Sequence, residues 1–173
     1  GNTAGTLDDV YTAALLAERD AEIALSPGIR WGNSLLPGQD ITFEDVTNGC
    51  AMSYPNCYRV MMTGARLKEI LEDVADNLFN PAPYYQQGGD MVRTGGLGFT
   101  LDVAGAVGQR ISRMVHLKSG APIDANREYV VAGWASVNEG TQGPPIWQVV
   151  EQHLARVQTV DVQPHEAVKL VGA

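Results

Sequence analysis

Apolar residues recur at the spacing of an amphipathic helix in several stretches of the chain. The first covers residues 7–18, where Thr6 supplies a hydroxyl cap, and the pattern predicts a helix there. The strongest pattern covers residues 67–78, where one apolar stripe faces acidic and basic positions and Thr63 is the expected cap. Two further helices are predicted, a short one after a cap at Thr42 and a last one over residues 146–157.

Shorter apolar runs predict strands at residues 21–25, 58–62, 98–103, 110–116 and 129–137. Helices and strands interleave without a regular strand–helix–strand repeat, so we expect an α+β fold in which a mixed sheet is flanked by helices. The chain has 173 residues, of which 45% are hydrophobic, which is enough for one buried core. Residues 1–173 are therefore expected to form a single domain.

The pattern breaks between residues 80 and 98. This stretch contains two prolines, the adjacent aromatics Tyr84 and Tyr85, and the pair Gly88 and Gly89, which predict a long loop. Long loops in compact domains carry function more often than other segments. A second irregular segment is predicted at residues 140–145.

The charge balance narrows the class of partners. There are 12 Lys and Arg residues against 20 Asp and Glu residues, and no stretch concentrates basic side chains. Nucleic acid and anionic membrane surfaces are therefore not expected partners. No run reaches the roughly 18 apolar residues that a membrane helix needs, and no charged-then-apolar leader opens the chain.

The spacing of the cysteines and histidines predicts no metal site in this chain. Cys50 and Cys57 flank a turn-like segment, so they are either a disulfide or two small buried thiols. His116, His153 and His165 are scattered, without the ligand spacing of a zinc site. No G-x-S-x-G or H-E-x-x-H pattern occurs, so neither a metal ligand nor a catalytic residue is expected here.

Two arginines follow glycine-containing segments. Arg30 comes after a Ser-Pro-Gly-Ile segment that includes Gly28, and Arg93 comes after Gly88-Gly89-Asp90. A guanidinium beside open backbone amides suits sulfate, phosphate or sulfonate groups. The alternative is that each arginine pairs with the excess carboxylates on the surface. Asp90 either orients an arginine or substrate, or caps its own backbone.

Aromatic side chains near the predicted loops could form a wall for a substrate. Ordinary packing in the core or at its rim is the alternative for each of the candidates, which are Trp31, Tyr54, Tyr84, Tyr85, Trp134 and Trp147.

Several segments resemble a known family in order and spacing. Residues 21–30, 36–42 and 62–72 are similar to the C-terminal domain of the 5′-nucleotidases, and nearly the whole chain follows that pattern. Within that superfamily, the segments that resemble SoxB, the sulfate thiohydrolase of thiosulfate oxidation, are residues 26–32, 72–81 and 84–93.

The resemblance implies a divided enzyme. In SoxB an N-terminal calcineurin-like domain binds two manganese ions, and the C-terminal domain contacts the substrate. That substrate is a sulfonate carried on a cysteine near the C-terminus of the SoxYZ carrier protein, and the enzyme works in the periplasm. This chain is thus expected to hold the substrate while its metal-binding partner domain supplies the hydrolytic chemistry, and it is expected to be inactive alone.

The resemblance also assigns roles to residues. Arg30 matches the anion-binding arginine and would contact the sulfonate, while Arg93 would contact the sulfonate or orient its loop. The channel for the carrier arm would be lined by Tyr84, Tyr85, Gln86 and Gln87.

Two alternatives remain, a 5′-nucleotidase substrate domain and a non-catalytic module that binds anions or docks a carrier. The nucleotide alternative is disfavoured because Met91 and residues 140–145 stand where nucleotidases place the two aromatics that stack on the base. Trp147 or Tyr85 could substitute for these aromatics in part.

Overall fold

The computed structural model describes residues 3–29, 34–50, 54–136, 140–162 and 167–172. The helices are α1 (Thr6–Glu18), α2 (Phe43–Cys50), α3 (Gly64–Phe79) and α4 (Ile146–Val157), with a 3₁₀ turn η1 at Pro83–Tyr85. The strands are β1 (Ile23–Ser26), β2 (Tyr58–Thr63), β3 (Arg93–Gly95), β4 (Leu97–Asp102), β5 (Ile111–His116), β6 (Ala121–Pro122), β7 (Glu128–Gly133) and β8 (Val168–Val171).

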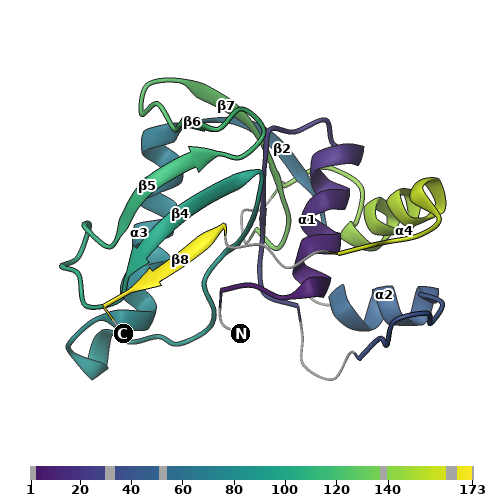
Figure 1. Cartoon of the computed structure of the whole chain (residues 1–173), viewed down its shortest axis with the longest axis horizontal. Helices are drawn as coiled ribbons and strands as arrows, with labels where there is room; N and C mark the ends of the chain where they lie inside the picture. The colour runs from purple at the N-terminus through teal and green to yellow at the C-terminus, as the bar shows by residue number, and fades with distance from the viewer. Residues whose placement is uncertain (1–2, 30–33, 51–53, 137–139, 163–166, 173) are drawn as a thin grey trace.

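The described strands form two four-stranded sheets (Figure 1). One has the order β2-β7-β1-β3 and the other β6-β5-β4-β8. Each sheet is mixed, because β1 pairs parallel with β7, and β4 parallel with β8, while the remaining pairs are antiparallel. The predicted α+β class with mixed strand directions and flanking helices is confirmed, with two sheets in place of one.

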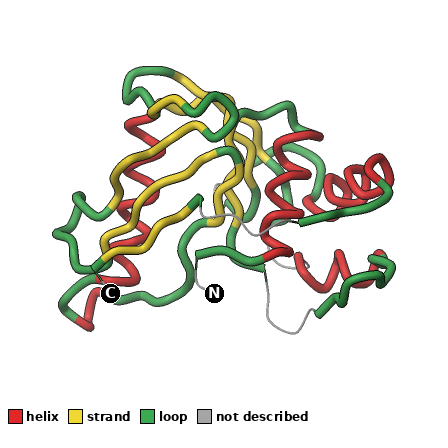
Figure 2. The backbone as a smooth tube through the Cα atoms, viewed as in Figure 1, coloured by secondary structure: helices red, strands yellow, loops and turns green. Residues whose placement is uncertain are grey.

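The alternating side chains of β1 divide the core into two layers. Ala24 faces α1, α2 and α4, whereas Ile23 and Leu25 face α3 and the second sheet. Figure 2 shows the same arrangement, with α1, α2 and α4 on one side of the central strands and the second sheet on the other. Strand β1 is thus buried on both faces, which explains why its first three residues are all apolar.

Helix starts follow local hydrogen bonding. The Thr63 hydroxyl accepts a bond from the Arg66 amide at 3.2 Å, which confirms the predicted cap of α3. At α2, Thr42 and Asp45 bond each other's backbone amides in a reciprocal capping box. The predicted Thr6 cap of α1 is wrong. Gly5 occupies the cap position without a side-chain bond, and Thr6 is the first helical residue.

The loop predicted over residues 80–98 is shorter than expected. It contains η1, and it ends at β3, so Arg93 is the buried first residue of a strand and does not project from irregular backbone. Strand β3 could not be predicted from the sequence, because it is only three residues long and is followed by Gly96. Its pairing with the distant β1 defines it.

The structure resolves the alternative left open for the cysteines. Cys50 and Cys57 are free thiols, fully buried in the layer formed by α1, α2 and α4. Burial raises the pKa of Cys57 to about 12. Among the described helices, none is long and apolar enough to cross a membrane.

Candidate functional site

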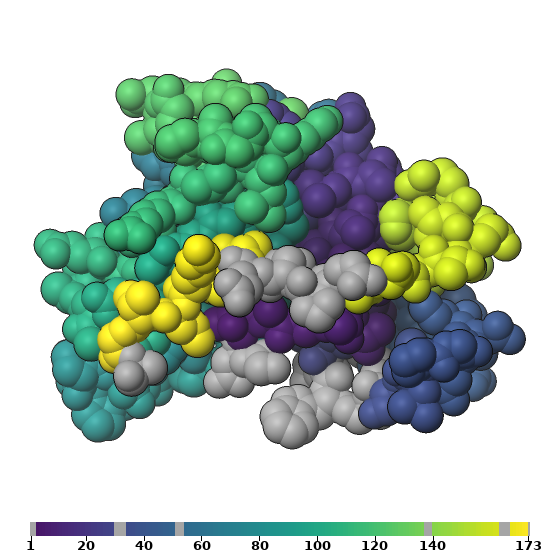
Figure 3. Space-filling view, viewed as in Figure 1, coloured from purple at the N-terminus to yellow at the C-terminus, as the bar shows by residue number. Residues whose placement is uncertain are grey.

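A pocket of about 880 Å³ opens where α1 begins. Its walls are residues 4–8 at the start of α1, residues 34–39 before α2, and residues 160–162 after α4, and Asp90 and Arg93 contribute from the β3 side. In Figure 3 the purple start of the chain is exposed between the teal segment that precedes β3 and the blue segment that contains α2. The pocket thus joins segments that are far apart in the sequence.

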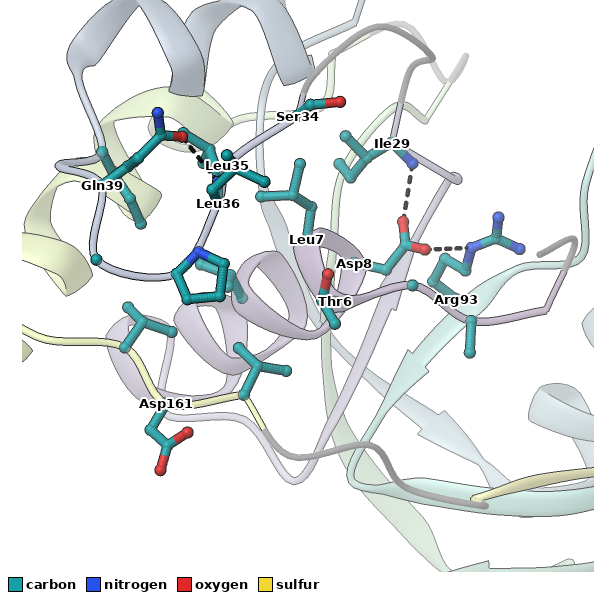
Figure 4. A pocket seen from close by; sticks show the side chains of 18 of the residues that line it. Thr6, Leu7, Asp8, Ile29, Ser34, Leu35, Leu36, Gln39, Arg93 and Asp161 are labelled. Atoms are coloured by element: carbon teal, nitrogen blue, oxygen red, sulfur yellow. Dashed lines mark hydrogen bonds and ion pairs between the residues drawn. The ribbon is translucent and has the colours of Figure 1, made fainter.

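One end of the pocket is built around a buried ion pair. Asp8 is 6% exposed and Arg93 is 5% exposed, and Arg93 Nε donates to Asp8 Oδ2 at 2.8 Å. The other carboxylate oxygen, Oδ1, accepts a bond from the backbone amide of Ile29 at 2.8 Å. Figure 4 shows both bonds converging on Asp8. The carboxylate therefore links α1, the loop after β1 and the start of β3.

The Arg93 guanidinium has further partners in the segment that directly precedes β3. Nη1 donates to the carbonyl oxygen of Met91 at 3.2 Å, and Nη2 lies 3.5 Å from Asp90 Oδ2. Two carboxylates thus offset its charge, one buried and one 37% exposed at the side chain. An arginine held in this way is well suited to bracing the pocket wall.

Two glycines give these side chains the space they need. A Cβ on Gly28 would lie 2.7 Å from Arg93 Nη2 and 2.8 Å from Asp90 Oδ2. A Cβ on Gly5 would lie 2.8 Å from Asp8 Oδ2. Both positions therefore require close approach of backbone to a charged group.

The end of β1 is fixed from the other side by a tryptophan. Trp134 follows β7, is 4% exposed, and its indole Nε1 donates to the Ser26 hydroxyl at 2.8 Å. Because β1 and β7 run parallel, their carboxyl ends lie at the same edge of the sheet. Loops at such an edge commonly form ligand sites.

Away from the ion pair, the pocket is lined by both apolar and polar side chains. Ile29 lines it beside the ion pair, and Figure 4 shows Leu7 and Leu35 on the side away from Arg93, toward Gln39. Arg93 is the one cationic side chain among the described lining residues. The arrangement suits a ligand that combines a polar head with an apolar or peptide-like body.

The structure brings some of the predicted site residues together. Gly28, Asp90 and Arg93 meet at the ion-pair end of the pocket. Arg30, which was predicted to contact the anion, and Trp31, which was predicted as part of an aromatic wall for the substrate, lie outside the described residues.

The remaining predicted residues lie on the surface around η1. Tyr84 is 91% exposed and Tyr85 is 62% exposed, and their rings meet edge to face at 5.4 Å. The Gln86 side chain donates to the Asn80 carbonyl at 2.7 Å, and Gln87 is exposed. None of these four residues is among the described residues that line the pocket.

Sequence reasoning missed Asp8 as a site residue. Its position in the first turn of α1 indicated an ordinary carboxylate near the positive end of a helix dipole. Gly5, three residues earlier, was the available signal, because its missing Cβ makes room for the carboxylate.

Comparison with known proteins places this chain in a family. Residues 2–152 match the family model described as 5′-nucleotidase, C-terminal domain. Comparison with curated protein sequences finds no match.

Solved structures agree with the family model. The sulfate thiohydrolase SoxB of Thermus thermophilus, solved in complex with glycerol, is 34% identical with a TM-score of 0.89 over 99% of this chain. A putative 5′-nucleotidase from Staphylococcus aureus is 18% identical with a TM-score of 0.74 over 98% of this chain. The NAD nucleotidase of Haemophilus influenzae is 19% identical with a TM-score of 0.77 over 96% of this chain.

This chain spans only part of these proteins, with 33% of SoxB and of the Haemophilus nucleotidase covered and 37% of the Staphylococcus protein. The similarity to the two nucleotidases shows the fold, and the similarity to SoxB extends to the sequence. The match over residues 2–152 and the shared fold lead to one conclusion: the chain belongs to the 5′-nucleotidase C-terminal domain family.

Proposed function

We propose that this chain is the substrate-binding domain of a SoxB-type hydrolase, which releases sulfate from a cysteine S-sulfonate on a SoxYZ-like carrier protein. The observation that carries the proposal is the 34% identity to SoxB over 99% of this chain. The two nucleotidases described above reach 18% and 19% over a similar share.

In this proposal the loop after β1 supplies the anion contact. Arg30 binds the sulfonate, and Trp31 lies beside it in sequence. Asp90 and Arg93 form the adjoining wall, which Gly28 allows to pack closely. The exposed residues Tyr84, Tyr85, Gln86 and Gln87 receive the arm of the carrier.

The hydrolytic chemistry belongs to another part of the enzyme. Among the described residues, no group of three or more His, Cys, Asp or Glu side chains is placed to hold a metal ion. In this proposal, the two manganese ions that the resemblance to SoxB implies belong to an N-terminal metallophosphoesterase-like domain. The proposed compartment is the periplasm, where the SoxB family acts.

The test is a titration of the chain, followed by calorimetry or NMR, with a peptide that carries S-sulfocysteine and separately with AMP. We expect tighter binding of the peptide. Arg30→Ala should weaken peptide binding by about ten-fold or more, because a charge-assisted hydrogen bond is lost. The control is Arg66→Ala, which removes an exposed arginine of α3 that pairs with Glu69.

Tighter binding of AMP than of the peptide would assign the chain to the nucleotide-binding branch of the family. Absence of binding to both ligands would contradict the proposal.

A further inference from the structure

The two oxygens of the Asp8 carboxylate have different partners. Oδ2 accepts from the Arg93 side chain, and Oδ1 accepts from the backbone amide of Ile29, each at 2.8 Å. Figure 4 shows that the two partners approach from different segments of the chain. Asp8 thus holds a side chain and a piece of backbone at the same time.

The backbone of Ile29 needs such a partner. The pairing of β1 with β3 ends where Ser26 lies opposite Arg93, and the next residue, Pro27, has no amide hydrogen with which to extend the ladder. After Gly28 the chain leaves the sheet, so the Ile29 amide is held by a side chain and not by a neighbouring strand. Arg30 follows directly in the sequence.

Arg93 is already engaged on several sides. Its side chain is 6% exposed, and its described partners are Asp8, the Met91 carbonyl and Asp90. The guanidinium also lies over Gly28, where a Cβ would come within 2.7 Å. These contacts make Arg93 a rigid support on which Asp8 is oriented.

We infer that Asp8 is a positioning residue for the loop after β1: through the Ile29 amide it fixes the backbone that directly precedes Arg30 in the sequence, and Arg93 orients the Asp8 carboxylate. This inference rests on the proposed role of Arg30. Asp8 and Arg93 act through the loop and need no contact with the substrate.

The test compares Asp8→Ala with Asp8→Asn in the full chain. Asp8→Ala removes both bonds, whereas Asp8→Asn keeps an oxygen that can accept from Ile29 and loses the charge that pairs with Arg93. We expect hydrogen exchange of the Ile29 amide, measured by NMR, to accelerate by about ten-fold or more in Asp8→Ala. The acceleration should be smaller in Asp8→Asn. This second variant also provides the test if Asp8→Ala fails to fold.

Binding of the S-sulfocysteine peptide provides a second measurement. Asp8→Ala should weaken it by about ten-fold when Arg30 is present and have little further effect in an Arg30→Ala background, because residues that act through one another are not additive. The matched control is Asp76→Asn, which removes a carboxylate 2.9 Å from the buried Arg110. It should lower the melting temperature without changing Ile29 exchange or peptide binding.

Unchanged exchange of the Ile29 amide in Asp8→Ala would overturn the inference. Equal losses of peptide binding in the Arg30 and Arg30→Ala backgrounds would also overturn it. Failure of the wild-type chain to bind the peptide would instead contradict the proposed function, and the exchange measurement would still decide the role of Asp8.

Discussion

At the scale of single residues, the pocket depends on places where a side chain is missing. The φ of Gly28 lies outside the left-handed region, so backbone conformation is not the reason for glycine there. The reason is contact, because the Arg93 guanidinium and the Asp90 carboxylate occupy the volume that a Cβ would fill. A methyl group added at this position would therefore displace both the Arg93 guanidinium and the Asp90 carboxylate.

We expect Gly28→Ala to lower the free energy of unfolding by about 1–3 kcal/mol, because the added methyl group overpacks a rigid site. It should also weaken binding of the S-sulfocysteine peptide. Urea unfolding and calorimetry measure the two effects. Gly108→Ala is the control, since its φ of +78° makes alanine costly while nothing lies within 4 Å of the added Cβ. Equal effects of both variants on peptide binding would contradict this explanation.

At the scale of elements, α3 is attached to the second sheet through charged groups as well as apolar contacts. Glu72 is 8% exposed, and its carboxylate accepts bonds from the backbone amides of Arg110 at 3.1 Å and Ile111 at 2.8 Å. Asp76, one turn later, pairs with the side chain of Arg110 at 2.9 Å. The helix thereby satisfies the amides at the start of β5.

Replacement of Glu72 by alanine should lower the free energy of unfolding by about 2–4 kcal/mol, because two buried amides lose their acceptor. Urea unfolding measures this change. Glu69→Ala is the matched control on the same helix, where the carboxylate pairs with Arg66 and 67% of its side chain is exposed. That control should change stability by less than about 1 kcal/mol. A comparable loss in both variants would show that the acceptor role of Glu72 is unimportant.

At the scale of the whole molecule, the two core layers differ in their chemistry. The layer of α1, α2 and α4 encloses both thiols and the phenol of Tyr11, which donates to the Val46 carbonyl at 2.7 Å. Burial raises the pKa values of Cys50, Cys57 and Tyr11 above their ordinary values. This layer is therefore stable only while these groups keep their protons.

Stability of the whole chain should consequently fall as the pH rises above 9. The folded protein holds the pKa of Cys57 at about 12, against an ordinary value of 9.0. The stabilising contribution is therefore complete below pH 9 and decreases as the pH rises toward 12. Melting temperatures between pH 7 and 11 measure the loss, which should be smaller in Cys57→Ala. An identical pH profile for the two proteins would rule out this contribution.

Local features of the sequence were sufficient to predict most helices and the family. The apolar stripe of α3 and its Thr63 cap depend on residues three and four positions apart. Such short spacings are visible in the sequence itself. The Ser-Pro-Gly-Ile segment before Arg30 likewise identified the loop after β1. Where the cap had no side chain, as at Gly5, the sequence pattern misplaced it by one residue.

Only the tertiary structure decided what joins the pocket together. Asp8 and Arg93 are 85 residues apart, and no local pattern relates them. The division into two sheets has the same origin, since β3 is defined by pairing with β1, and β8 by pairing with β4. The sequence by itself determined which segments form helices and which family they belong to, because those signals are local. The partners of its buried charges depended on long-range packing, which brings distant segments into contact.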